Sequence, residues 1–90
     1  MYRVDYSNLY KKTFKKLNTD DKLLVLEVIE ILASGQKLDI KYQDHKLKGN
    51  MSEYRECHIK PDLLLVYKKD KDILVLTCIR LTNHNNLNKN

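Results

Sequence analysis

The segment Ile73–Leu81 constrains the fold most, because it is apolar on both faces that a β-strand would present. A strand that is buried on both faces lies inside a sheet, not at its rim. The run Leu63–Lys68 before it reads as another strand, and the polar residues 69–72 between them form a turn. The chain is therefore predicted to end in a pair of strands, the last of which is internal.

A third strand is predicted just before this pair, at Met51–Ile59, where residue types alternate. The alternation puts Glu56 and His58 on one face, and Cys57 and Ile59 on the other. Pro61 marks a strand boundary, because proline has no N–H to donate to a neighbouring strand. Three strands joined by short turns predict an antiparallel meander.

The N-terminal part predicts a short strand at residues 2–6 and then two helices. Ser7 is suited to cap the first helix, whose buried stripe recurs at i, i+3, i+4 and i+7: Tyr10, Thr13, Phe14 and Leu17. The second helix runs from about Asp20 to Ser34, and Gly35 ends it. The order β-α-α-β-β-β predicts one α+β domain, residues 1–90, with the helical hairpin on one face of an antiparallel sheet.

Composition narrows the class of protein. The longest apolar stretch, Leu23–Leu32, contains two glutamates and is too short to span a bilayer. Residues 1–5 lack the apolar core of a secretory signal, so we expect a cytoplasmic protein without membrane partners. Cys57 and Cys78 form no CxxC pair and are interpreted as reduced core residues.

The net charge of +5 favours a polyanionic partner, which could be RNA, DNA or an acidic protein segment. Charge alone does not choose among these. Four lysines lie mostly on the outer side of the first helix, where they either form a solvated surface or follow an RNA backbone: Lys11, Lys12, Lys15 and Lys16.

All three histidines lie in loops or at strand ends of the C-terminal half: His45, His58 and His84. Metal-free RNA cleavage needs a base for the 2′-hydroxyl, an acid for the leaving 5′-oxygen and cations around the phosphate. His58 and Asp62 flank a proline-directed bend, so the carboxylate could orient the imidazole; a loop ion pair or a capping aspartate is the alternative.

The remaining candidates also have ordinary structural interpretations. His45 could be a solvated loop residue, His84 a frayed terminal residue, and Arg80 an edge arginine rather than a phosphate ligand. The histidines have no short HxxH or HxxxH spacing, so we predict no metal site.

Three segments together carry a family resemblance. Residues 42–49 (YQDHKLKG) are similar to the pattern Y-x-D-H-x-L-x-G, and residues 54–62 (YRECHIKPD) to Y/F-R-D/E-x-H-x-x-P-D. Residues 80–84 (RLTNH) are similar to R-x-G-S/T-H. On these motifs the chain resembles the YafQ-like branch of the RelE/ParE superfamily of type II toxin–antitoxin toxins, over almost its whole length.

This resemblance implies the RelE-like microbial RNase fold and a toxin that cleaves mRNA in the ribosomal A site without metal or other cofactor. The catalytic positions carry over to His45, His58, Asp62 and His84. By analogy, His58, oriented by Asp62 and helped by His45, removes the 2′-hydroxyl proton. His84 protonates the leaving oxygen, and Arg80 contacts the phosphate.

Further contacts follow from the same resemblance. Lys48 and Arg55 are expected near the phosphate, and the four lysines of the first helix are expected to face ribosomal RNA. The partner would be an acidic antitoxin, and operator DNA would be bound only through the toxin–antitoxin complex.

Two departures from the family pattern favour an alternative. Residues 82–83 (Thr-Asn) replace Gly-Ser/Thr, and Asn88 replaces a phenylalanine that would stack on a base. Losing such a platform weakens single-strand binding by about 1–3 kcal/mol. The alternative is a weakened or silent toxin that mainly binds its antitoxin. A free-standing DNA-binding repressor is a third reading, but no recognition helix or ribbon is predicted.

Overall fold

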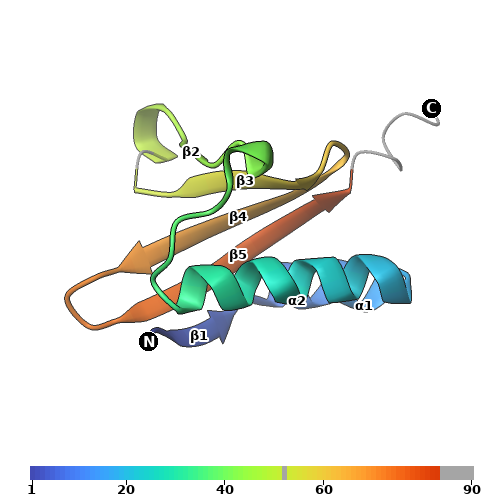
Figure 1. Cartoon of the computed structure of the whole chain (residues 1–90), viewed down its shortest axis with the longest axis horizontal. Helices are drawn as coiled ribbons and strands as arrows, with labels where there is room; N and C mark the ends of the chain where they lie inside the picture. Colours follow the sequence, from blue (N-terminus) through green and yellow to red (C-terminus); the bar gives the residue numbers. More distant parts are fainter. Residues whose placement is uncertain (52, 84–90) are drawn as a thin grey trace.

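The computed structural model describes residues 1–51 and 53–83 (Figure 1). The elements follow in the order β1 (Arg3–Tyr6), α1 (Asn8–Lys16), α2 (Thr19–Ala33), the 3-10 helix η1 (Ile40–Tyr42), β2 (His45–Lys46), the 3-10 helix η2 (Gly49–Met51), β3 (Arg55–Lys60), β4 (Leu63–Asp70) and β5 (Val75–Asn83). This order confirms the predicted β-α-α-β-β-β arrangement and adds the two-residue strand β2.

The strands form one sheet in the order β1-β5-β4-β3-β2. Strand β5 lies between β1 and β4, so its prediction as an internal strand is confirmed. The pairs β4–β5, β3–β4 and β2–β3 are antiparallel, whereas β1 is parallel to β5. The sheet is therefore mixed, because the first strand runs along the outer side of the last one rather than extending the meander.

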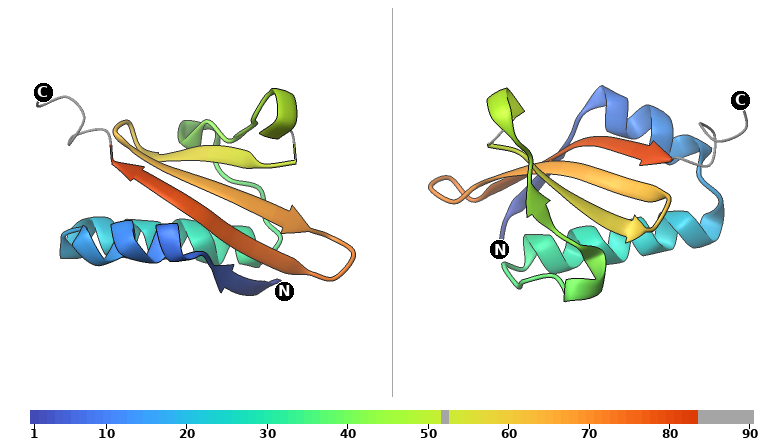
Figure 2. Two further views of the ribbon diagram at one scale, coloured as in Figure 1. Left: turned by 180° about the vertical axis from the view of Figure 1, so that it is seen from behind. Right: turned by 90° about the horizontal axis from the view of Figure 1, so that it is seen from above.

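The core lies between the two helices and one face of the sheet (Figure 2). Every second residue of β3 and β4 points into it, among them Cys57, Ile59 and Leu65. Cys57 and Cys78 are buried and free, as predicted. Burial raises the pKa of each thiol to about 12, because a thiolate is poorly stabilised in an apolar interior.

The helix boundaries follow the capping residues of the sequence. The Ser7 side chain accepts a hydrogen bond from the Tyr10 N–H, and it also donates one to the Ile79 carbonyl of β5. Asn18 caps α2 by accepting from the Asp21 N–H. Gly35 has φ = +86° directly after α2, which confirms it as the stop signal.

The turn between β4 and β5 lies two residues later than predicted. The Asp70 carboxylate accepts hydrogen bonds from the N–H groups of Asp72 and Ile73, which moves the turn to residues 71–74. Leu74 closes it in the left-handed region, at φ = +55°. Side-chain hydrogen bonding within the turn, rather than hydropathy, sets this boundary.

The loop after α2 rises to the far edge of the sheet and supplies β2 there (Figure 1). The residues of β3 that point away from the helices, Glu56 and His58, therefore share the open face of the sheet with the loop. Neither helix of the described chain has the length and apolar character needed to cross a bilayer.

Candidate active site

One row of the sheet register collects polar residues on the open face. His45 pairs with Glu56, Glu56 with Val66, and Val66 with Arg80. Paired residues on neighbouring strands point to the same side of a sheet. With strands about 4.8 Å apart, the row is about 14 Å long, so His45 and Arg80 lie at its two ends.

The imidazoles of His45 and His58 lie side by side on this face. Their ring centroids are 6.3 Å apart and the rings are tilted by 41°. His45 is exposed and His58 is half-buried. Two of the three predicted catalytic histidines are thus adjacent, although 13 positions separate them in the sequence.

Both nitrogens of His45 have a partner. Nδ1 lies 2.7 Å from the Gln43 carbonyl oxygen, and Nε2 lies 3.4 Å from Oε1 of Glu56. A carbonyl oxygen only accepts hydrogen bonds, so Nδ1 carries the proton. In the neutral ring, Nε2 then has a free lone pair; in the protonated ring, Nε2–H faces the Glu56 carboxylate. This arrangement suits a group that takes up a proton.

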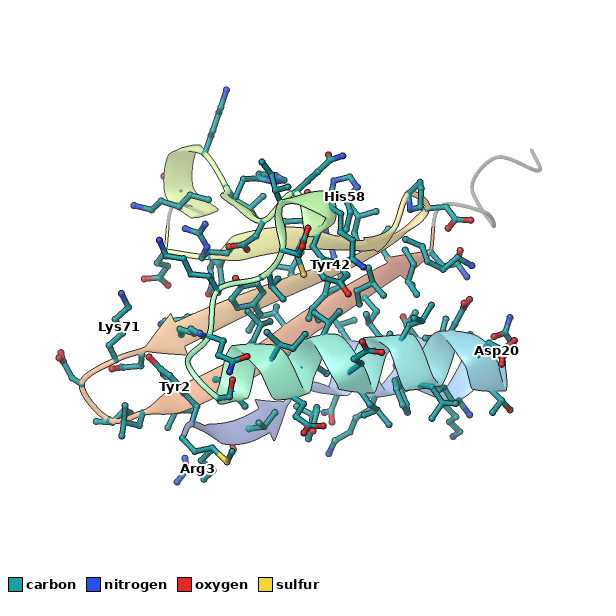
Figure 3. All side chains as sticks on the ribbon, viewed as in Figure 1. Tyr2, Arg3, Asp20, Tyr42, His58 and Lys71 are labelled. Atoms are coloured by element: carbon teal, nitrogen blue, oxygen red, sulfur yellow. The ribbon has the colours of Figure 1, made fainter. Side chains whose placement is uncertain are left out.

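His58 lines a cavity of about 530 Å³ between the sheet, the η1 loop and α2. Figure 3 shows Tyr42 next to His58, and Lys41 and Lys60 also line the cavity. Nζ of Lys60 donates to Asp21 at 3.1 Å, and this bond raises the pKa of Lys60. The cavity thus combines one imidazole, one aromatic ring and two cations.

Asp62 lies in the turn between β3 and β4, beyond a register shift between His58 and Lys60. Among the described residues, Asp62 forms neither a hydrogen bond nor an ion pair with His58. Its charge instead adds to the raised pKa of Lys60. An orienting role for Asp62 therefore stays a prediction.

Arg80 is exposed at the end of β5 nearest to α1. It lines a hollow of about 360 Å³ together with residues of both elements: Thr13, Lys16, Leu17, Leu81, Thr82 and Asn83. No carboxylate forms an ion pair with Arg80 in residues 1–51 and 53–83. The predicted phosphate ligand and one lysine of the basic helix thus share one hollow.

His84 and Asn88 lie outside the described residues. Asn83, the last described residue, pairs with Leu63, which directly follows Asp62. The β3–β4 turn and the end of β5 therefore lie at the same end of the sheet (Figure 1).

Arg55 lies on the opposite face from His58, because the two residues are an odd number of positions apart in β3. Its guanidinium donates to the Asp44 carboxylate from Nη2 at 2.9 Å and from Nε at 3.1 Å. These bonds raise the pKa of Arg55. The structure thus places Arg55 in an internal ion pair and not beside His58, while Lys48 is exposed just after β2.

Comparison with known proteins identifies the family. The family described as "Bacterial toxin of type II toxin-antitoxin system, YafQ" matches residues 2–89. This chain belongs to the YafQ family. A curated relative, the mRNA interferase toxin YafQ of Escherichia coli K12, is 31% identical over 74 residues, which are 79% of this chain and 80% of that protein.

Solved structures confirm the YafQ fold. A copper-bound mutant toxin from Helicobacter pylori is 39% identical, with a TM-score of 0.83, and the match covers 97% of this chain and 99% of that one. YafQ in the E. coli DinJ–YafQ toxin–antitoxin complex is 27% identical, with a TM-score of 0.79 and 96% of both chains covered. The mixed α+β architecture is therefore that of YafQ toxins.

Sequence reasoning missed two carboxylates of this YafQ-family site. Glu56 lies two residues before His58 and therefore on the same face, but only the pairing of β2 with β3 brings it to His45. Asp44 directly precedes His45, and its partners Arg55 and Tyr67 are distant in sequence. Both residues lie within the family motifs of residues 42–49 and 54–62, so the motifs could have identified them as candidates.

Proposed function

We propose that this YafQ-family toxin is an endoribonuclease that cuts mRNA by attack of the 2′-hydroxyl on the adjacent phosphate. The observation that carries the proposal is the pair of imidazoles, His45 and His58, whose ring centroids lie 6.3 Å apart on the open face of the sheet. One ring of such a pair can take a proton while the other donates to the charge that develops on the phosphate. The mRNA interferase name of the E. coli K12 relative supports the same reaction class.

His45 is assigned as the principal base, which revises the balance of roles expected from the family resemblance. The Gln43 carbonyl holds the proton on Nδ1 and leaves Nε2 free to accept the 2′-hydroxyl proton. Glu56 then faces the imidazolium that forms. His58 assists from the neighbouring position, and its protonated ring stabilises the phosphorane-like charge.

His84 remains the assigned acid for the leaving 5′-oxygen, and Asp62 keeps its proposed role of orienting His58. Asp62 precedes Leu63, the pairing partner of Asn83, and this register supports a joint site at that end of the sheet. Arg80 and Lys16, which share a hollow, would hold the phosphate groups on the far side of the sheet row.

The proposed reaction is metal-independent, as the family resemblance implies. The described residues contain no group of three or more His, Cys, Asp or Glu side chains able to hold a metal ion. Although a similar H. pylori toxin is copper-bound, the proposed chemistry needs only proton transfer and charge stabilisation, and no step is assigned to a metal.

The proposed setting is the A site of a translating ribosome. Four lysines of α1 are exposed and would face ribosomal RNA: Lys11, Lys12, Lys15 and Lys16. The proposed protein partner is an acidic antitoxin, through which operator DNA would be bound. Exposed apolar side chains on the same helical layer, Leu9, Leu23 and Leu26, support a protein partner there.

The test is induced expression followed by primer extension on a translated message, repeated with purified ribosomes. His45→Ala and His58→Ala are each expected to reduce cleavage by at least a hundredfold. Glu56→Gln keeps the shape but removes the charge that faces His45, and a three- to tenfold loss is expected. Glu53→Gln, at an exposed ion pair with Lys68, is the control.

Two results would contradict the proposal. Undiminished cleavage by both histidine variants would remove His45 and His58 from the chemistry. Absence of any cleavage by the wild-type protein, with tight antitoxin binding retained, would instead favour the silent binding module suggested by Thr82 and Asn88.

A further inference from the structure

The Asp44 carboxylate is the most highly connected side-chain group beside the candidate site. One oxygen accepts from the Tyr67 hydroxyl at 2.5 Å, and the other accepts from Nε and Nη2 of Arg55 at 3.1 and 2.9 Å. We propose that these three residues, here called the Asp44 clamp, position His45 for catalysis. This inference rests on the proposed ribonuclease function and assigns residues that act through His45.

The clamp ties the loop to two adjacent strands at a single point. Arg55 of β3 and Tyr67 of β4 are direct partners in the sheet register, so their side chains lie next to each other on the helix-facing side. A guanidinium that binds a carboxylate through two N–H groups fixes its orientation as well as its distance. The Tyr67 hydroxyl donates a third hydrogen bond to the carboxylate, and Tyr67 itself is held in the core, where it is only 1% exposed.

The Asp44 clamp holds the loop next to His45, whereas Leu38 and Tyr42, which pack against the core, hold the part of the loop before Gln43. Strand β2 has two residues and lies at the sheet edge, where it pairs only with β3. Gln43, just before Asp44, is in the left-handed region with φ = +50°, a conformation that costs a side-chain-bearing residue free energy. An anchor at Asp44 therefore fixes the backbone immediately ahead of His45.

Because side chains alternate along an extended segment, fixing Asp44 also fixes the position of His45. Successive residues of an extended segment point to opposite faces, so Asp44 enters the clamp while His45 points toward the open face. There His45 reaches both Glu56 and the His58 ring. A shift of about 1 Å in a reacting group can cost on the order of a hundredfold in rate, so loosening the clamp should act on turnover.

The opposing assignment is that Arg55 binds substrate phosphate, as the family resemblance suggested. Against it, the Nε and Nη2 N–H groups of Arg55 already donate to Asp44, and the hydrogen bond to Asp44 is the largest cause of the raised pKa of Arg55. Arg55 also faces away from His58. The two assignments differ in measurable ways, because a phosphate ligand governs substrate affinity whereas a positioning residue governs turnover.

The experiment compares Asp44→Asn, Tyr67→Phe and Arg55→Lys with Glu53→Gln, which removes a carboxylate from an exposed ion pair elsewhere. Thermal unfolding first establishes that each variant is folded. Cleavage of mRNA on purified ribosomes then gives kcat and KM, and NMR gives the nuclear Overhauser contact between the His45 and His58 rings. Folded clamp variants are expected to lose about tenfold in kcat, with KM within twofold of wild type and a weakened ring contact.

The role of the clamp can be tested even if one of the variants does not fold. Tyr67→Phe removes one hydroxyl and preserves the buried ring, so it carries the test if Asp44→Asn is unstable. Wild-type kcat and an unchanged ring contact in the folded variants would overturn the clamp. An Arg55→Lys effect confined to KM and to salt dependence would overturn it too, and would make Arg55 a phosphate ligand.

If the proposed ribonuclease function were wrong, the results would differ from those expected if only the clamp were wrong. If His45→Ala cleaved RNA normally, the catalytic assignment would fall whatever the clamp variants did. The ring contact between His45 and His58 would still report whether the clamp sets their spacing, because that measurement needs no substrate.

Discussion

A single backbone carbonyl, that of Gln43, determines which nitrogen of His45 carries the proton in the neutral ring. Had the carbonyl turned away, Nδ1 and Nε2 would compete for the proton, and only part of the population would have the basic nitrogen facing the open sheet. The left-handed conformation of Gln43 aims the carbonyl at the ring two residues later. Local backbone geometry at one residue thus replaces the orienting carboxylate that a histidine base commonly has.

The buried thiols make stability depend on alkaline pH. Cys57 and Cys78 have pKa values of about 12 in the folded chain, above the ordinary value of 9.0. Below pH 9 both states keep the protons, so the full stability is present. As pH rises from 9 toward 12 the unfolded chain loses them first, so the free energy of unfolding should fall.

Urea unfolding between pH 8 and 11 measures this slope. Cys57→Ala should retain only part of it. The raised pKa values of Tyr10 and Tyr67, which are also caused mainly by burial, act in the same direction and account for the rest. Stability that stays constant from pH 9 to 11 would show that the thiols are not buried in solution.

At the scale of elements, hydropathy predicts the strands and helices well, because core positions recur with the period of each element. Two predictions differ from the structure. The strand predicted at Met51–Ile59 begins only at Arg55, because Gly49–Met51 form a 3-10 helix. Ile73 and Leu74 look like strand residues but are exposed in the turn. The N–H groups of Asp72 and Ile73 donate to the Asp70 carboxylate, and these two hydrogen bonds form the turn that contains Ile73 and Leu74. Such local side-chain bonding is not visible in an apolar pattern.

This turn gives a prediction about stability. Leu74 is held at φ = +55°, where a Cβ atom is strained and glycine is not. Leu74→Gly should raise the free energy of unfolding by about 0.5–1 kcal/mol, as measured by urea unfolding. Ile73→Gly is the matched control, since Ile73 has no positive φ and should gain nothing; equal gains for both would mean that strain at Leu74 is not the cause.

The candidate site could be predicted only in part. The family motifs in residues 42–49 and 54–62 identified His45 and His58, and the structure places the centroids of their rings 6.3 Å apart. The face on which Arg55 lies follows from strand alternation, but its partner Asp44 comes from an irregular loop whose path no periodicity encodes. Glu56 was overlooked because β2, which brings His45 beside it, is only two residues long.

At the scale of the whole molecule, charge is distributed so that an RNA strand could run from the histidines to α1. Arg80, near the end of β5, and Lys16 of α1 line the same hollow. A strand lying along this route would release counterions from its phosphates, so affinity should fall steeply as salt rises.

Replacing one lysine between the histidines and α1 should reduce the salt dependence of RNA affinity by the contribution of one phosphate contact. For single-stranded RNA binding, Lys16→Ala is expected to lower the slope of log affinity against log salt by about 0.7. Lys71→Ala, an equal charge change in the β4–β5 turn at the other end of the sheet, should leave the slope unchanged. Fluorescence anisotropy with a labelled oligonucleotide measures both; identical slopes would place the RNA elsewhere.

The position of β5 also bears on when the toxin becomes harmful during its own synthesis. Among the described strands, β5 lies between β1 and β4, and it is the last of them to be synthesised. Until residues 75–83 have been synthesised, β1 and β4 have no strand to join them, and Arg80 is absent. On the proposed site assignment, we therefore expect a polypeptide that ends before Val75 not to cleave RNA, so that an antitoxin already present can meet the protein as it becomes active.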